Sequence, residues 1–477
     1  MAAGLLRLAL VLGAGLALSA AADSGGGGLT CPFEYERHSL ESILSGAQRP
    51  WLWDGAYHNF DSTDTGGRFC VNCHRGSLFP TWCGRRPTKQ PYWDLQLCQE
   101  TITRMAIDEA GKHDDIRGAL TMTPCDLHSQ LAGRTLWIIG DSMSKDLIKA
   151  YKCFMIEFWD LQQYHITNNF TAMHHLHSLP GYGEPNCIHM VGGGRMCQIH
   201  AIQGDLFVNT TRAVSGVLPL IMDSGLVAAD DVIVLNFGLW HGEVVRPAYV
   251  QHLHELGRFY ASRRDKFPHV FFMETPKQHF AGARDGDFQT EWLSDPVKKK
   301  GPYTCGPVAG VRYNGDGSLS ASGDDPVASA VAGGTWRNVD ARAILRDGYG
   351  MRLVPVYNTT VAFWNMHRSN FAGTECSHYC HPSVPQLWLW VLHRTLADAG
   401  VVALPAKDGP PHRSRQGCAL FFERDETQLG LPKPVEKVYA EADARREATL
   451  REQHGFLWRL FHMLGRGRRR RLQIRLP

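Results

Sequence analysis

The stretch from Thr135 to Ser144 constrains the fold of this chain more than any other. Residues rich in β-branched and aromatic side chains run into Gly140, and the apolar residues then follow helical spacing from Met143 to Phe158. This change of pattern predicts a strand, a tight turn and an amphipathic helix. Ser142 would then lie at a sheet edge and a helix N-terminus, where free amides favour a developing negative charge. We interpret Ser142 as a candidate nucleophile; the alternative is that Asp141 and Ser142 only cap the helix.

The length and composition predict a globular protein of several parts. At 477 residues with 44% hydrophobic residues, the chain is long enough for one large domain or two ordinary ones. One arginine, a short apolar run and small residues predict a signal peptide at 1–24, with a signal anchor as the alternative. The other expected parts are a cysteine-rich region at 25–130, an α/β domain at 131–405 with a disordered insertion at 306–334, a linker at 406–434, and an amphipathic helix with a basic tail at 435–477.

Cysteines and glycosylation motifs indicate the secretory pathway, either the Golgi or the cell exterior. Thirteen cysteines imply several disulfides, and the odd count leaves at least one free or paired between chains. Residues 70–74 match a haem-attachment pattern, but a disulfide framework explains the same cysteines, so we expect no cofactor and no metal. Three N-glycosylation sequons begin at Asn169, Asn209 and Asn358.

The charge distribution argues against nucleic acid as a partner. The formal charge is +3, but six arginines lie between 466 and 475, and subtracting these six from +3 leaves −3 for the rest. A mildly acidic body does not favour nucleic-acid binding. Apolar residues at helical spacing precede the arginines, so the tail suits an anionic membrane or an acidic glycan, or else it is a solvated disordered tail.

Strand and helix patterns alternate along the main domain, after a polar stretch from 165 to 200. That stretch holds six irregularly spaced histidines, which fits a long surface loop better than a metal site. Beyond it we expect strands at 231–236, 269–275 and 352–357, and helices at 247–264, 339–347 and 384–399. The alternation predicts a three-layer α/β fold, a parallel sheet with helices on both faces and a site at the carboxyl ends of the strands.

Polar groups suited to acyl transfer occur at three predicted strand exits. Ser142 would attack a carbonyl, and His378 would take the serine proton. The Ser142 amide, the Asn236 side chain and the Gly238 amide would bind the oxyanion. Glu375, three residues before His378 on a loop leading into the last helix, would orient the imidazole.

Four sequence blocks coincide with these positions: Gly140–Ser142, Leu235–Trp240, Phe271–Phe280 and Glu375–Pro382. Over about residues 130–400 they resemble the trichome birefringence-like (PC-esterase) proteins, polysaccharide O-acetyltransferases with an SGNH-hydrolase-like core. The resemblance implies that Ser142 accepts an acetyl group and that Glu375 and His378 complete the triad. We also expect Lys145, Trp240 and His241 to contact the substrate.

The chain departs from that family at two of these positions. The family has Asp where this chain has Glu375, and Arg where it has Lys145. We expect an O-acetyltransferase that takes acetyl from a donor and passes it to a glycan through acetyl-Ser142. The alternatives are a carbohydrate acetylesterase and a non-catalytic glycan-binding wall protein.

Overall fold

The computed structural model describes residues 31–52, 114–155, 158, 186–208, 216–295, 303–379 and 384–404, apart from a few positions inside these ranges. The predicted signal peptide, linker and basic tail lie outside the described residues, as do Asn169 and Asn209. Within the described ranges, no helix has both the length and the apolar character needed to span a membrane.

A six-stranded sheet forms the centre of the molecule. Its order is β2-β3-β1-β4-β5-β8, and the five strands from β3 to β8 run parallel, whereas β2 pairs antiparallel with β3. The predicted parallel sheet is therefore confirmed. The strands are β1 (Thr135–Gly140), β2 (Asn186–His189), β3 (Arg195–His200), β4 (Val232–Asn236), β5 (Val270–Met273) and β8 (Arg352–Val354).

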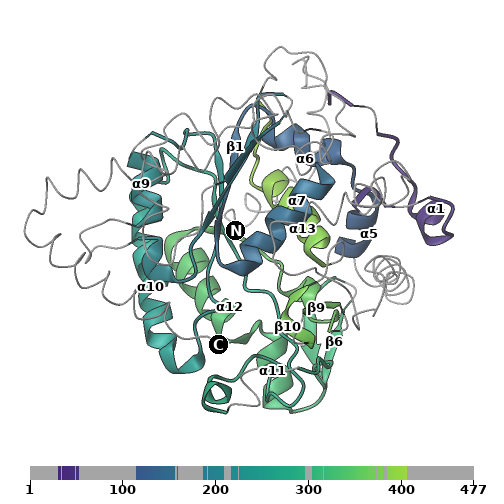
Figure 1. The fold of residues 1–477 in the computed structure, drawn as a ribbon, viewed down its shortest axis with the longest axis vertical. Coiled ribbons are helices and arrows are strands. Elements are labelled where there is room, and N and C mark those ends of the chain that lie inside the picture. Colours follow the sequence, from purple (N-terminus) through teal and green to yellow (C-terminus); the bar gives the residue numbers. More distant parts are fainter. Residues whose placement is uncertain are drawn as a thin grey trace, which may run out of the picture.

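Helices cover both faces of this sheet, as Figure 1 shows. One face carries α5 (Asp114–Thr121), α6 (Pro124–Leu131), α7 (Ser142–Phe154) and α13 (Val384–Asp398). The other carries α9 (Val217–Asp223), α10 (Arg246–Ala261) and α12 (Thr335–Ala341). A π-helical segment (Arg342–Gly348) continues α12, and short 3-10 helices occupy Gly204–Leu206, Glu243–Val245, Thr290–Ser294 and Asn358–Thr360.

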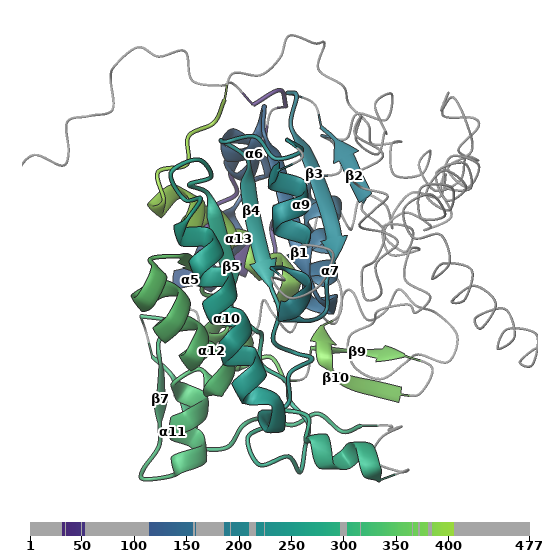
Figure 2. The ribbon, with the colours of Figure 1, turned by 90° about the vertical axis from the view of Figure 1, so that its left-hand side faces the viewer.

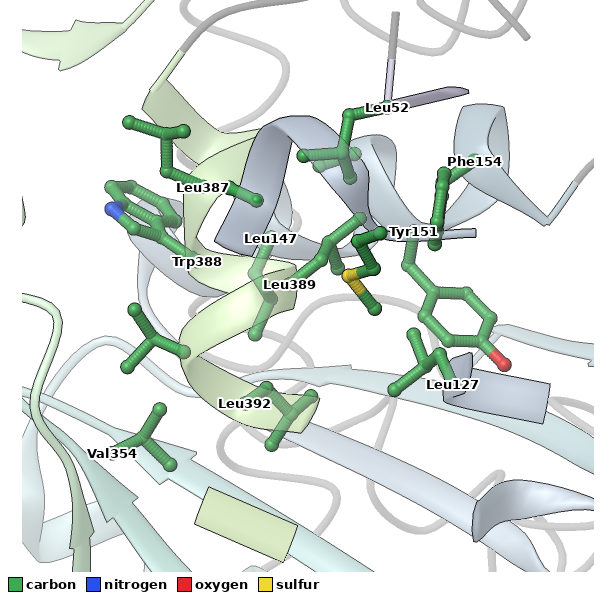
Figure 3. Close-up of a cluster of buried hydrophobic side chains, with 14 of the residues drawn as sticks. Leu52, Leu127, Leu147, Tyr151, Phe154, Val354, Leu387, Trp388, Leu389 and Leu392 are labelled. Carbon is green, nitrogen blue, oxygen red and sulfur yellow. The ribbon is translucent and has the colours of Figure 1, made fainter. Parts of the chain in front are cut away.

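Alternating side chains of the central strands divide the core into two halves. On β1, Leu136 and Ile138 pack with α7 and α13, whereas Trp137 and Ile139 pack with α9 and α10. This period of two follows from the pleat of a strand buried on both faces. Figure 3 shows the first half, in which Leu147 of α7 lies among Leu387, Leu389 and other side chains of α13.

Two strands of the sheet were not predicted. Residues 186–200 lie in the stretch that we expected to be a loop, yet they form β2 and β3. Along β3 buried Met196, Cys197 and Ile199 alternate irregularly with half-buried Arg195 and Gln198. The half-buried polar side chains interrupt the alternation of apolar residues along β3. The sequence pattern of this strand is therefore too weak to predict it.

The insertion at 306–334 is folded, which corrects the expected disorder. It forms a hairpin of β6 (Val311–Tyr313) and β7 (Leu319–Ala321), followed by α11 (Pro326–Ala332). Val331 packs in a small cluster with Tyr357 and Val361, although the segment looked too rich in Gly, Ser and Asp to fold. Its few apolar residues suffice because the main domain supplies the rest of this cluster.

Among the described residues, two disulfides connect segments that are distant in the sequence. Cys31 bonds to Cys125 and joins the N-terminal segment, with α1 (Leu40–Leu44), to α6. Cys305 bonds to Cys376 on β10 (Gly373–Tyr379), which pairs with β9 (His367–Asn370). The expected use of cysteines in disulfides is thus confirmed at these two bonds, and both indicate an oxidising compartment.

Candidate active site

The turn between β1 and α7 has the predicted strand–turn–helix geometry. Asp141 caps α7, and its Oδ1 accepts a hydrogen bond of 2.9 Å from the Met143 amide. A side chain at Gly140 would collide with the Asn236 carbonyl and with Ser144 Oγ, so only glycine fits between β4 and the helix. Ser142 is therefore the first helical residue at the carboxyl end of β1, as predicted.

Two backbone amides near Ser142 are available for a ligand. The Ser142 Oγ is buried and has no hydrogen-bond partner among the described residues. Within the same ranges, the amides of Ser142 and Gly238 donate no hydrogen bond. Since β1 and β4 are neighbours and Gly140 pairs with Asn236, both amides belong to the same edge of the sheet. This arrangement suits a negatively charged oxygen.

His378 lies on β10, which is in contact with α7 (Figure 2). We expected a loop here, but residues 373–379 form a strand whose pairing with β9 is irregular between Thr374 and Tyr379. Glu375 lies in this irregular part, and its side chain is outside the described residues. Ser142 Oγ makes no hydrogen bond to His378, so the predicted contact with the base is not formed in this structure.

The segment after β5 holds β10 in place through three successive residues. The Tyr379 hydroxyl donates to the Lys277 carbonyl (2.7 Å), Gln278 Nε2 donates to Ser377 Oγ (2.6 Å), and the His279 amide donates to the Cys376 carbonyl (3.0 Å). This segment belongs to the block Phe271–Phe280, for which the sequence predicts no role. Its function in the structure is to fix the strand that carries His378.

A pair of buried histidines extends this contact. His279 Nδ1 lies 2.7 Å from His367 Nε2, and His279 Nε2 lies 2.9 Å from the Val361 carbonyl. His367 Nδ1 lies 2.9 Å from the carbonyl of His378, and its ring stacks on Tyr379. Burial, together with charge on His367 and Lys277, holds the pKa of His279 well below its usual range. The pair therefore connects the backbone of the candidate base to the loop at Val361.

Asn236 does not have the predicted orientation. Its Nδ2 donates to the Met273 carbonyl at 2.9 Å and approaches the Glu274 carbonyl at 3.5 Å. Both carbonyls lie at the end of β5. A buried backbone carbonyl that is not paired within the sheet needs a hydrogen-bond donor from another group. Asn236 thus ties β4 to β5 in this structure, and the oxyanion donors that remain are the amides of Ser142 and Gly238.

The loop after β4 carries the remaining predicted residues, in different environments. Trp240 is 56% exposed, whereas His241 is only 3% exposed and its Nε2 faces His252 Nδ1 at 3.4 Å. Burial, His252 and Arg337 lower the pKa of His241 to about 4, so the ring is neutral near pH 7. The ring of Trp240 is thus accessible from solvent, whereas the ring of His241 is not.

Lys145 lies half-buried in the first turn of α7, on the side of β3. Burial and the charge of Lys145 lower the pKa of His200, the last residue of β3, to about 4. Asn358, the one sequon among the described residues, is half-buried, and its Nδ2 donates to the Gly317 carbonyl at 3.2 Å. No group of three or more His, Cys, Asp or Glu residues in the described ranges is arranged to hold a metal.

Arg337 on α12, for which the sequence predicted no role, donates hydrogen bonds to the loop after β4. Its Nε donates to the carbonyls of Gly238 and His241, both at 3.0 Å, and its NH2 group donates to His241 at 2.7 Å. Its NH1 group pairs with Asp287 at 2.7 Å, and Asp287 also pairs with the buried Lys277. These two cations keep the pKa of Asp287 low in spite of its burial.

The fold and the site together define an α/β protein with a serine at a helix N-terminus on the carboxyl edge of a parallel sheet. No protein-family model matches the chain, and a search of curated proteins found no match.

Proposed function

We propose that this protein is a serine-dependent O-acyltransferase that moves an acetyl group to a glycan hydroxyl through acetyl-Ser142. The observation that carries the proposal is the buried Ser142 Oγ at the N-terminus of α7, beside two free amides and a strand that bears a histidine. The resemblance to the trichome birefringence-like proteins supports the same chemistry. It also supports a lumenal location, in the Golgi or beyond, to which the two disulfides add.

The reaction would proceed in two transfers. His378 accepts the Ser142 proton as Oγ attacks the acetyl carbonyl, and the amides of Ser142 and Gly238 hold the oxyanion. The donor leaves with the proton from His378, and acetyl-Ser142 remains. A sugar hydroxyl then gives its proton to His378 as its oxygen attacks the acetyl carbonyl, and His378 returns that proton to Ser142 Oγ as the serine ester bond breaks. The exposed ring of Trp240 is suited to pack on the face of that sugar.

Esterase activity is the second candidate, because water in place of the sugar hydroxyl gives hydrolysis by the same first step. The two outcomes are separated by adding a glycan acceptor to the acetylated enzyme and measuring whether acetate appears free or on the glycan. The tail at 435–477 would contribute by retaining acidic glycans or anionic membrane near the site.

Mass spectrometry of the Ser142 peptide tests the proposal. After incubation with an acetyl donor, we expect acetyl on Ser142 of the wild type and none on Ser142→Ala. Ser144→Ala is the matched control, since Ser144 lies in the same helical turn and is not assigned to the chemistry. Absence of acetyl-Ser142 in the wild type with every donor, while glycans still bind, would establish the non-catalytic wall protein instead.

His378 and Glu375 are tested by rate. His378→Asn should lower the rate of acetylation about a hundredfold or more, because no other group would accept the serine proton. Glu375→Gln should lower it similarly if the carboxylate orients His378, and Glu375→Asp tests whether β10 is built around the longer side chain. An unchanged rate for Glu375→Gln would exclude Glu375 from the triad.

A further inference from the structure

His200, the last of the six histidines between 165 and 200, ends β3 beside the turn that carries the candidate nucleophile. Gly140, the last residue of β1, pairs with His200 on one side and with Asn236 on the other. Its carbonyl accepts a hydrogen bond of 2.8 Å from the Ala201 amide, and the next amide, that of Asp141, donates to the Asn236 carbonyl at 3.3 Å. Neighbouring strands lie about 4.8 Å apart, so His200 is one strand away from the turn, on the side opposite β4.

The side chain of His200 belongs to the face of the sheet that α7 covers. Along β3, Met196 packs in the half of the core that contains α7, whereas Ile199 packs in the other half. Because successive side chains of a strand alternate, His200 lies on the same face as Met196. α7 also contacts β3 directly, and Lys145 in its first turn is close enough for its charge to act on the His200 ring. The ring therefore lies beside the helical turn that begins at Ser142.

The His200 ring is neutral and has unused hydrogen-bonding capacity. It is half-buried, and burial together with the charge of Lys145 lowers its pKa to about 4. Neither of its ring nitrogens makes a hydrogen bond within the described part of the chain, whereas His241 on the β4 side faces His252. A neutral imidazole has one N–H donor and one acceptor nitrogen, and a hydroxyl group can pair with either of them. A carboxylate or a phosphate could pair only with the donor.

We propose that His200 is a substrate-binding residue that holds a second hydroxyl of the acceptor sugar, next to the hydroxyl that receives the acetyl group. The oxyanion donors belong to the ends of β1 and β4, which leaves the β3 side of Ser142 for the sugar. The substrate class is a glycan with two neighbouring free hydroxyls. This role of His200 deepens the proposed function and rests on it for the acetyl transfer, whereas the binding of a sugar at His200 can be measured without any transfer.

Nuclear magnetic resonance of the histidine rings tests the binding in the full chain. The histidines carry an isotopic carbon label at Cε1, and the signal that disappears in His200→Gln is assigned to His200. Near pH 7, without an acetyl donor, we expect the methyl glycoside of glucose, xylose, galactose or mannose to shift this signal in a saturable way. His254 is the control, since it is also half-buried but lies on α10, on the opposite face of the sheet, 3.3 Å from the Tyr349 hydroxyl. Its signal should not move.

The partition of acetyl-Ser142 measures the same contact during the reaction. With p-nitrophenyl acetate as donor, the acetyl group passes either to the glycoside that binds or to water. In His200→Phe the ratio of transfer to hydrolysis should fall about five- to tenfold, because one hydrogen bond to the sugar is lost. His200→Gln should recover part of the transfer, since its amide has a donor and an acceptor. The ratio is taken per acetyl-Ser142 formed, so the rate of serine acetylation cancels, and His254→Gln should leave the ratio unchanged.

Monodeoxy analogues of the same glycoside identify the hydroxyl that His200 holds. One analogue that can still accept acetyl should lower transfer by the wild type about five- to tenfold. The same analogue should cost His200→Phe nothing further, because the enzyme variant and the sugar analogue remove the same hydrogen bond. Equal losses for the analogue in the wild type and in His200→Phe would show that His200 does not contact that hydroxyl.

Two results would overturn the role of His200. One is that no glycoside moves its signal, whether or not acetyl-Ser142 forms. The other is an equal partition in the wild type, His200→Phe and His200→Gln; if the phenylalanine variant does not fold, the glutamine variant alone decides. If acetyl-Ser142 never forms but a glycoside shifts the His200 signal, the sugar site stands and the proposed acyl transfer fails. If acetyl-Ser142 forms while the His200 signal stays fixed, the acyl transfer stands and the sugar site fails.

Discussion

Asp141→Asn should make the protein more stable at alkaline pH. Burial raises the pKa of Asp141 from 3.8 to about 7, so the folded state binds the proton more tightly than the unfolded chain does. The contribution of this group to stability is therefore full below about pH 4 and is lost as the pH rises from there to 7, because the ionised group is unfavourable in the fold. At about 1.4 kcal/mol per pH unit, the ionised carboxylate costs about 4 kcal/mol at pH 8.

The measurement is urea unfolding of wild type and variant at pH 8, 6 and 4.5 with the disulfides intact. The amide keeps the cap and removes the ionisation, so the variant should gain up to about 4 kcal/mol at pH 8 and only about 1 kcal/mol at pH 4.5. A variant less stable than the wild type at pH 8 would refute the reasoning, since the charge would then be stabilising.

Asp287→Asn is the matched control with the opposite sign. Lys277 and Arg337 lower the pKa of Asp287, so its contribution is present above the unfolded value of 3.8 and is lost as the pH falls below it. Removing this charge leaves two buried cations without their carboxylate. We expect a loss of about 3–5 kcal/mol at pH 8 from the same chemical substitution.

Three further predictions concern the surroundings of the site. Gly238→Ala should lower activity and reduce stability by about 1–3 kcal/mol, measured by urea unfolding, because the new methyl group meets the buried Thr275 hydroxyl. Replacing Cys305 and Cys376 by serine should lower stability by about 2–4 kcal/mol and speed hydrogen exchange in β10, since a loop of 71 residues is opened. His279→Gln should lessen the stability lost between pH 7 and 5 by up to about 2 kcal/mol, because His279 stays neutral in the fold but is protonated near pH 6.5 when unfolded.

The elements that sequence predicted correctly have unbroken apolar patterns. The strand at 135–140, the helix after it and the strand at 232–236 were recognisable because their residues are buried on both faces or on a clear stripe. β3 was missed because Arg195 and Gln198 interrupt its pattern. The folded insertion was missed because its apolar partners, Tyr357 and Val361, come from elsewhere in the chain.

The candidate site also contains features that the sequence predicted and features that it did not. The place of Ser142 at the start of α7 was predictable because a local turn sets it. The role of His378 stays a prediction, because its contact with Ser142 is not formed in this structure. The direction of the Asn236 amide was not predictable, since it depends on where the neighbouring β5 ends. Arg337 had no signal in the sequence: an arginine in a helix is usually solvated, and its burial here depends on carbonyls from a loop almost a hundred residues earlier.

The paired histidines beneath β10 have too few hydrogens for their contacts. Two carbonyls and one nitrogen–nitrogen contact need three N–H groups, whereas two neutral imidazoles carry only two. Burial keeps the pKa of His279 low, so its ring carries one N–H. When His367 is also neutral, one of the three contacts lacks its hydrogen, and the carbonyl of His378 is one of the groups that compete for the two N–H groups. The backbone of the candidate base is thus coupled to Val361 by the choice of tautomer.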